Sequence, residues 1–342
     1  KQRIRNAKEI PELRELRNQF HEKNSDHLLI FDPIGLIEHV NQFHDLIIRR
    51  TIELSEHRLT DKGRGPLPVS YAFILFGSAG RGEQTLWSDQ DNGLVYEDSD
   101  DPEEAASYFQ ELALCIEEGL EAAGYPPCDG GVLATNELWK HSLSGWTGLL
   151  DEWFEDPAFE KVRHMLIVAD ARCIYGNSTL LDRLKRHFLS GVEARPGMLK
   201  NMLHNTLRHK VLLSFFGHLI REQYGEDSGG IDIKYGAYIP VVNGVRLLAI
   251  QAGLPETSTL ARINKLVEGA VINKGMGLEW IEAFRTILKL RTMTPYFLEE
   301  GMYNTRGKIS ADDLTKELIP HLKKALRTAN DLQKFVKKRI EG

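Results

Sequence analysis

Residues 71–96 constrain the fold of this chain more than any other stretch, and they read YAFILFGSAGRGEQTLWSDQDNGLVY. The apolar run at 71–76 predicts a strand buried on both faces, and such strands belong to sheets that helices cover. Residues 93–96 predict the end of a second strand, 102–123 an amphipathic helix and 131–135 a third strand. Because two strands precede the first long helix, this order predicts a small α/β core and not a Rossmann domain.

Helical periodicity dominates the chain on both sides of this core. From residue 10 to 57 apolar residues recur at three- and four-residue steps, and the segment DKGRGPLP ends that pattern with two glycines and two prolines. After Leu180 two apolar stripes predict bundle helices. The first consists of Leu203, Leu207, Val211 and Phe215, and the second runs from Leu314 to Ile340.

We therefore predict a mixed α+β fold in three parts. An N-terminal helical region occupies 1–66, an α/β core 67–186 and a helical bundle domain 187–342.

Composition excludes several classes of protein. The 342 residues are 42% hydrophobic and 27% charged, and the net charge of -6 argues against DNA or RNA as the main partner. Three cysteines without C-x-x-C spacing fit a reducing cytoplasm, and Cys128 and Cys173 are expected to be small buried hydrophobes. No apolar run approaches the roughly 18 residues that cross a bilayer, so we expect no membrane association.

Two aspartates follow the glycine turn. In a strand, residues two apart point to the same face, so Asp89 and Asp91 are expected to project side by side. Their charges would repel each other unless a divalent cation lay between them. Mg²⁺ prefers oxygen ligands and shares them with substrate phosphates, so the pair predicts a Mg²⁺ site that Mn²⁺ would also suit.

The turn itself predicts a phosphate site. Gly77 and Ser78 stand where a strand ends and a helix begins, with Gly80 in the same turn. Exposed amides, the Ser78 hydroxyl and the missing side chain at Gly77 would let phosphate oxygens approach closely. Arg81 would add a charge-assisted fork to the same phosphates.

Four further polar residues have two interpretations each. Glu83 and Gln84 either orient metal-bound waters or cap the helix. Lys234 and Arg246, in a glycine-rich segment, either bind an acidic group of a substrate or pair with structural partners.

The spacing of these motifs also resembles a known family. Phe76-Gly77-Ser78, ten residues and then Asp89-x-Asp91 resemble the signature of the DNA polymerase beta-like nucleotidyltransferases. GSAGRGEQTLWSDQDN is similar, more closely, to bacterial nucleotidyltransferases related to PII-protein uridylyltransferase. Residues 124–139 and ADARCIYG at 169–176 resemble further segments of that family, and 231–291 resembles its C-terminal substrate-binding domain.

This resemblance implies a polymerase-beta-like core and a function. It implies Mg²⁺-dependent transfer of a nucleoside monophosphate from ATP or UTP to a hydroxyl, with a protein among the candidate acceptors, and release of pyrophosphate. Catalytic residues would be Asp89, Asp91 and a third carboxylate. A homodimer is left open.

The third carboxylate is where the sequence departs from the family pattern. The expected strand reads GGVLATN and contains no acid. Asp129 and Asp170 are the candidates, and Asp170 is preferred because it lies in a family-like segment. Without such a residue, metal binding survives while deprotonation of the nucleophile weakens.

A nucleotide-binding sensor without turnover is therefore the alternative function. Relatives carry regulatory domains upstream, and a chain that begins with Lys is compatible with the removal of one. The intact Gly77, Ser78, Asp89 and Asp91 favour the enzyme.

Overall fold

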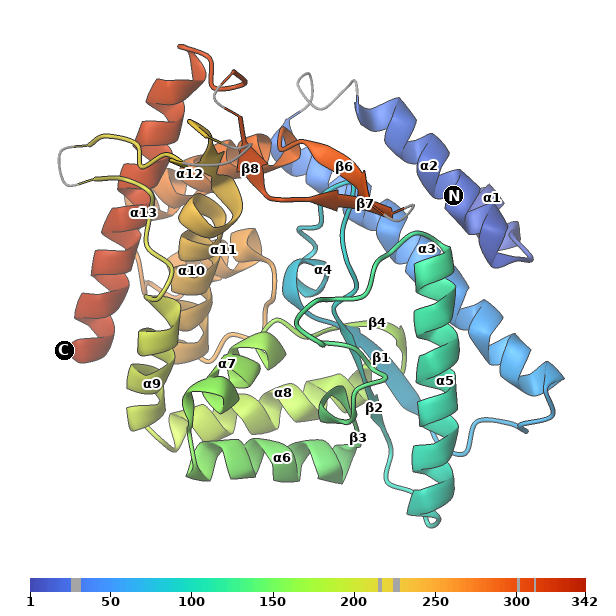
Figure 1. Cartoon of the computed structure of the whole chain (residues 1–342). Coiled ribbons are helices and arrows are strands. Elements are labelled where there is room, and N and C mark those ends of the chain that lie inside the picture. Colours follow the sequence, from blue (N-terminus) through green and yellow to red (C-terminus); the bar gives the residue numbers. More distant parts are fainter. Residues whose placement is uncertain (26–31, 215–216, 224–227, 300–301, 311) are drawn as a thin grey trace.

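The computed structural model describes residues 1–342 except 26–31, 215–216, 224–227, 300–301 and 311 (Figure 1). Its helices are α1 (Gln2–Asn6), α2 (Ile10–Ser25), α3 (Pro33–Asp61), α4 (Gly77–Arg81), α5 (Pro102–Ala122), α6 (Leu143–Glu155), α7 (Phe159–Val168), α8 (Ser178–Glu193), α9 (Gly197–Thr206), α10 (Ile239–Gln251), α11 (Thr259–Glu268), α12 (Lys274–Thr292) and α13 (Leu318–Glu341). Its strands are β1 (Tyr71–Leu75), β2 (Asn92–Tyr96), β3 (Lys140–Ser142), β4 (Arg172–Gly176), β5 (Ile231–Asp232), β6 (Tyr296–Glu299), β7 (Met302–Thr305) and β8 (Lys308–Ile309). A 3₁₀ turn, η1, covers Glu137–Trp139, and a π-helical turn, η2, covers Lys234–Tyr238. The fold is mixed α+β, as predicted.

A four-stranded mixed sheet lies at the centre, in the order β3-β2-β1-β4. β1 is antiparallel to both β2 and β4, whereas β2 and β3 are parallel. Every residue of β1 is buried, as predicted for a strand covered on both faces. Phe73 and Leu75 pack among residues of α3 and α5, whereas Ala72 and Ile74 pack among residues of α6 and α8. The alternation of side chains along β1 thus builds two helical layers around one sheet.

The predicted third strand at 131–135 is wrong. These residues form turns, because Gly131 has a positive φ of 65° and its carbonyl accepts a hydrogen bond from the Asn136 side chain. They contact the sheet at Asn92, whose N–H donates to the Val132 carbonyl at 3.0 Å and whose Oδ1 accepts from the Ala134 N–H at 2.8 Å. The strand that pairs with β2 is β3, which begins at Lys140.

Three helix predictions also need different boundaries. The N-terminal pattern is divided, since α3 restarts at Pro33 with the Asp32 carboxylate accepting from the Gly35 N–H. α9 ends at Thr206, so Val211 lies outside it and Phe215 lies outside the described residues. Leu314 precedes α13, whereas the rest of the predicted stripe lies within or against that helix.

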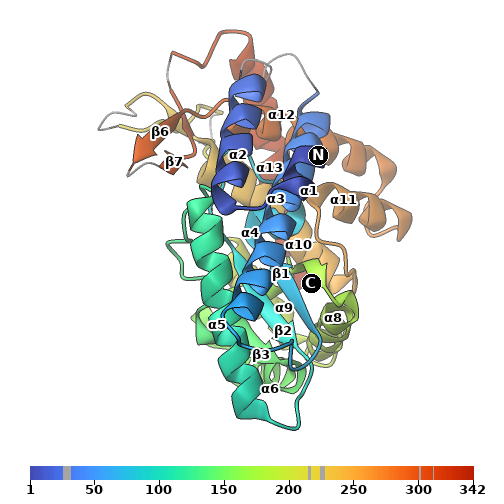
Figure 2. The same ribbon diagram turned by 90° about the vertical axis from the view of Figure 1, so that its right-hand side faces the viewer.

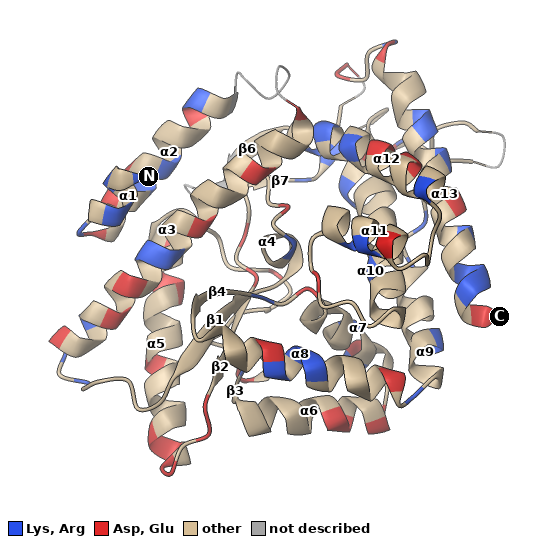
Figure 3. Ribbon diagram, turned by 180° about the vertical axis from the view of Figure 1, so that it is seen from behind, with Lys and Arg blue, Asp and Glu red and all other residues tan. Residues whose placement is uncertain are grey.

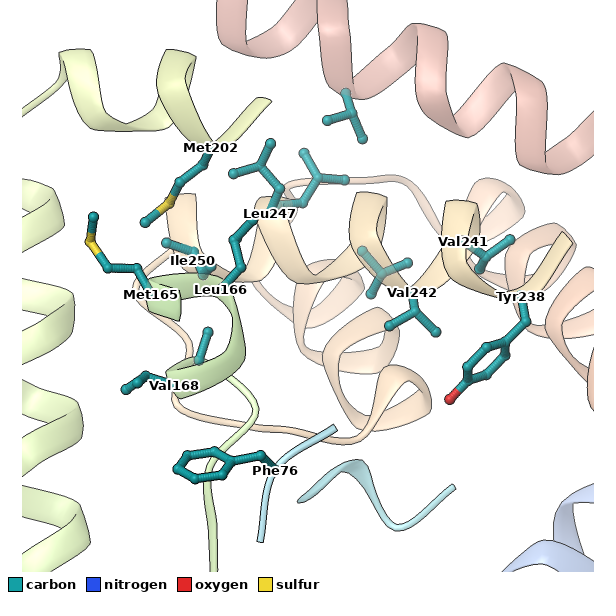
Figure 4. Close-up of a cluster of buried hydrophobic side chains, with 14 of the residues drawn as sticks. Phe76, Met165, Leu166, Val168, Met202, Tyr238, Val241, Val242, Leu247 and Ile250 are labelled. Atoms are coloured by element: carbon teal, nitrogen blue, oxygen red, sulfur yellow. The ribbon is translucent and has the colours of Figure 1, made fainter. Parts of the chain in front are cut away.

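One hydrophobic core continues from the sheet into the C-terminal helices. Met165 and Leu166 of α7 pack in the same cluster as Met202 of α9 and as Leu247 and Ile250 of α10 (Figure 4). The division at residues 186 and 187 stays a prediction, but the packing joins the segments on its two sides.

The remaining helices frame this core. α1 and α2 contact α3 along the outside of the molecule, as the view in Figure 2 shows. Lys and Arg positions are interspersed with Asp and Glu positions along the helices seen from behind (Figure 3). Among the described residues, no helix combines the length and apolar character that crossing a bilayer requires.

Gly80 illustrates how tightly α4 sits on the sheet. A Cβ at this position would lie within 3 Å of the carbonyl oxygens of Leu75 and Asp170. We predict that Gly80→Ala lowers the free energy of unfolding by about 1–3 kcal/mol, because backbone atoms must shift to admit the methyl group. Urea denaturation measures the change.

Gly148→Ala is the matched control. Gly148 lies in α6 and is exposed, and a Cβ added there would meet no atom within 4 Å, so alanine should stabilise the helix by about 0.5–1 kcal/mol. Equal stability of the two variants would contradict the packing role of Gly80.

Candidate active site

A cavity of about 210 Å³ lies between the α/β core and the C-terminal segments. The core side contributes Gly77, Ser78, Arg81, Asp89 and Asp91, all predicted from the sequence. The opposite wall includes Lys234, Tyr238 and Arg291. The structure therefore brings both predicted motifs to one concave surface.

The turn after β1 depends on glycine at position 77. Gly77 has a positive φ of 52°, and a Cβ there would collide with the carboxylate of Asp91. The Phe76 N–H donates to the Asp91 carbonyl at 2.9 Å and ties the turn to the aspartate loop. A side chain at position 77 would thus separate the two motifs.

Asp89 and Asp91 do not lie in a strand, contrary to prediction. β2 begins at Asn92, and the aspartates occupy the irregular segment before it. Asp89 is exposed and Asp91 is partly buried, yet both line the cavity. Burial, followed by the charge of Asp89, raises the pKa of Asp91 to about 6. The two carboxylates are therefore close enough to repel each other.

Hydrogen bonds to backbone groups fix the segment that carries Gln84, Asp89 and Asp91. The Gln90 N–H donates to the Pro126 carbonyl and the Gln90 Nε2 to the Tyr125 carbonyl, both at 2.9 Å. The Asn41 side chain of α3 bonds both backbone groups of Gln84. Gln84 therefore meets α3 through its backbone and is not among the residues that line the cavity.

The N-terminal arm packs against the same loop. The Arg17 guanidinium of α2 lies 3.9 Å from the ring centre of Tyr125 and 5.1 Å from that of Trp87. The His21 ring meets Trp87 edge-on at a centroid distance of 3.8 Å. Trp87 lines the cavity, so α2 supports one of its walls from outside.

Cys128 contacts the site instead of serving only as a small hydrophobe. Its thiol lies near the Asp91 carboxylate, and burial, followed by the charge of Asp91, raises the pKa of Cys128 to about 12. The thiol therefore stays protonated at neutral pH. Cys173 is half-buried, with its sulfur 3.4 Å from the Tyr175 carbonyl oxygen.

Asp170 occupies a buried ion cluster. Its Oδ2 accepts from Arg81 at 2.6 Å and from Arg246 at 2.8 Å, and its Oδ1 accepts from Arg262 at 2.7 Å. Although burial opposes ionisation, the three guanidiniums hold the pKa of Asp170 below its usual range. Asp170 is not among the cavity-lining residues. Asp129 is exposed and also lies outside that lining.

The other predicted residues divide between cavity and cluster. Lys234 lines the cavity, whereas Arg246 donates to Asp170 and Asn243 within the cluster. Glu83 accepts from Arg81, from the Tyr238 hydroxyl and from the Thr259 N–H. Glu83 thus joins the core to the N-terminus of α11.

Sequence reasoning missed Tyr238 and Arg291. Tyr238 lies in the glycine-rich segment, next to residues that we considered, and its hydroxyl accepts from Arg81 at 2.9 Å. Arg291 lies in the last turn of α12, where a basic residue is ordinary. No local pattern distinguishes it.

The donor set fits Mg²⁺. Asp89 and Asp91 offer carboxylate oxygens, and Mg²⁺ is commonly bound by one or two carboxylates together with water and substrate phosphates. Among the residues described, no group of three or more His, Cys, Asp or Glu side chains is arranged to hold a metal ion. The pair therefore suits a metal shared with a substrate better than an all-protein cage.

Two family models match the chain. Residues 22–160 match "Putative nucleotidyltransferase DUF294", and residues 196–340 match the model described as its substrate binding domain. The chain belongs to this nucleotidyltransferase family. No curated protein matches it. The family supports a transferase, and the cavity lies between residues of the two matched regions.

The repulsion between the carboxylates predicts a pH dependence for the metal-free nucleotidyltransferase. Because the pKa of Asp91 is raised to about 6 in the folded state, stability from its protonation is present below about pH 4 and is lost as the pH rises through 6. Asp89→Asn removes one cause of the shift, so we expect the pKa of Asp91 to fall. At pH 7 the variant should gain about 0.5–1 kcal/mol in urea denaturation with EDTA.

Asp129→Asn is the control, because it removes an exposed carboxylate outside the cavity lining. If Asp89→Asn has no effect at pH 7, or the same effect as the control, the carboxylates do not interact as described.

Proposed function

We propose that this nucleotidyltransferase moves a nucleoside monophosphate from ATP or UTP to an acceptor hydroxyl in the cavity between core and C-terminal segments. The observation that supports the proposal is the close approach of Gly77 and Asp91, because the glycine turn and two carboxylates then line one cavity. The acceptor oxygen would bond to the α-phosphorus as the bond to the β-phosphate breaks. Pyrophosphate would leave with the bonding electrons and the hydroxyl proton would pass to solvent.

The chain's own residues would bind and orient the nucleotide. Asp89 and Asp91 would hold Mg²⁺ or Mn²⁺, which would neutralise phosphate charge when bound. Ser78 offers its hydroxyl, and the first-turn amides of α4 lack intrahelical acceptors. Arg81 directs Nε, Nη1 and Nη2 to Glu83, Asp170 and Tyr238. It would therefore act on the phosphates through its charge and not through a free pair of N–H donors.

A nucleotide sensor is the second candidate, and one observation favours it. Neither Asp170 nor Asp129 is among the cavity-lining residues, so Asp89 and Asp91 are the acids described there. A site that holds a metal-bound nucleotide without a separate base would bind more readily than it would transfer. A protein acceptor, a homodimer and a cytoplasmic location stay predictions.

Label transfer tests the two functions. The protein is incubated with α-labelled ATP or UTP, Mg²⁺ and cell extract, and binding is followed by calorimetry. We expect transfer by the wild type, and neither transfer nor Mg²⁺-dependent nucleotide binding by Asp89→Asn/Asp91→Asn. Circular dichroism confirms that the double variant folds, and Asp129→Asn is its control.

The outcomes separate the candidates. Metal-dependent nucleotide binding by the folded double variant would refute the site. Binding by the wild type without transfer of any nucleotide would favour the sensor.

Asp170→Asn tests whether Asp170 is a base or an anchor. Because the change leaves three buried guanidiniums without their shared carboxylate charge, we predict a loss of about 3–5 kcal/mol in the free energy of unfolding. Turnover would fall together with stability. Asp129→Asn, at an exposed position, should alter neither.

A different pattern would support the catalytic role. An Asp170→Asn protein that melts like the wild type, binds Mg²⁺ and nucleotide normally, and loses turnover by roughly 10²- to 10⁴-fold would identify Asp170 as the base.

A further inference from the structure

The C-terminal wall of the cavity carries two cations on separate segments. Lys234 begins the π-helical turn η2, and Arg291 lies in the last turn of α12. Both line the cavity that Gly77, Ser78 and Asp91 border from the core. Both also belong to the region that matches the substrate-binding domain.

Tyr238 holds Arg291 in place, but one N–H group of the guanidinium has no acceptor among the described residues. Its guanidinium carbon lies 3.9 Å from the ring centre of Tyr238, which explains the position of the side chain. Its Nη1 is buried from solvent and has no hydrogen-bond partner among the described residues. A buried donor on a charged group that lacks an acceptor is costly, so stacking alone is a poor explanation of this arrangement.

The carboxylates nearby are already engaged. Asp170 and Glu83 accept from Arg81, Arg246 and Arg262, so this cluster contains one more guanidinium than carboxylate. Asp89 and Asp91 are the other acids described at the cavity, and we assign them to the metal. An anionic ligand in the cavity would supply oxygen acceptors to Arg291, whose side chain lines the wall opposite Gly77 and Asp91.

We propose that Arg291, with Lys234 beside it, binds the polyphosphate tail of the nucleoside triphosphate. This inference rests on the proposed function and assigns a substrate to the C-terminal domain, namely the phosphates of the nucleotide. Guanidinium groups bind phosphate oxygens through paired N–H donors. Stacking on Tyr238 fixes the orientation of the Arg291 guanidinium. The nucleotide would then be held from both walls, by metal and glycine turn on one side and by cations on the other.

Arg291→Met tests the proposal, because methionine keeps an apolar contact with Tyr238 and removes every donor. Calorimetry with Mg²⁺ measures the affinities for ATP, UTP, AMP and inorganic tripolyphosphate. We expect the affinities for ATP, UTP and tripolyphosphate to fall by roughly 10- to 100-fold while that for AMP stays within about twofold, so that the ratio of ATP to AMP affinity collapses. Arg291→Lys, which keeps the charge and loses the fork, should fall between the variant and the wild type.

Lys289→Met is the matched control, since it removes one charge from the same end of α12 at a position outside the cavity lining. Equal losses for ATP and AMP in Arg291→Met, no loss, or the same losses in Lys289→Met would overturn the inference. These results can occur while the wild type still binds ATP or UTP through Asp89 and Asp91, which leaves the proposed function standing. A wild type that binds none of the triphosphates would overturn both.

Discussion

The carboxylate of Asp170 is the interaction on which the arrangement of the molecule depends. It accepts hydrogen bonds from Arg81 of α4, Arg246 of α10 and Arg262 of α11, and so joins the turn after β1 to two C-terminal helices. All four side chains are buried. A buried ion cluster adds little net stability, but removing one of its charges is strongly destabilising. The cluster therefore fixes the relative positions of α4, α10 and α11. The position of the cavity between core and bundle follows from it.

A second constraint brings the aspartates to the turn. Ten residues separate Ser78 from Asp89. The Asn41 side chain holds this segment at Gln84, and Gln90, between the two aspartates, is held by its bond to the Tyr125 carbonyl. Gly77 leaves room for the Asp91 carboxylate, and the Phe76 N–H holds the Asp91 carbonyl. Asp89 and Asp91 therefore line the same cavity, although they do not lie in a strand as predicted. Loop hydrogen bonds achieve what strand alternation was expected to achieve.

Local patterns predicted what depends on local contacts. β1, α5 and the glycine turn follow from an apolar run, an amphipathic stripe and the conformational freedom of glycine. The sequence offered structural pairing as one interpretation of Arg246, but it did not identify Asp170 as the partner. That pairing joins residues 76 apart, and Arg81 lies 89 residues from the same carboxylate. Arg291 was missed for the same reason, since its stacking partner Tyr238 lies on another segment. The strand expected at 131–135 failed because the turn at Gly131 outweighed its apolar residues.

The two walls of the cavity have opposite electrostatic needs. The charge of Asp89 helps to raise the pKa of Asp91, so a cation would stabilise this pair, whereas Nη1 of Arg291 is a buried donor without an acceptor among the described residues. A metal ion with a nucleoside triphosphate would meet both needs at once, since the metal would neutralise the carboxylates and the phosphates would supply oxygens to the guanidinium. On the proposed function, the matched core and the matched C-terminal domain would form two halves of one binding site, and both line the cavity.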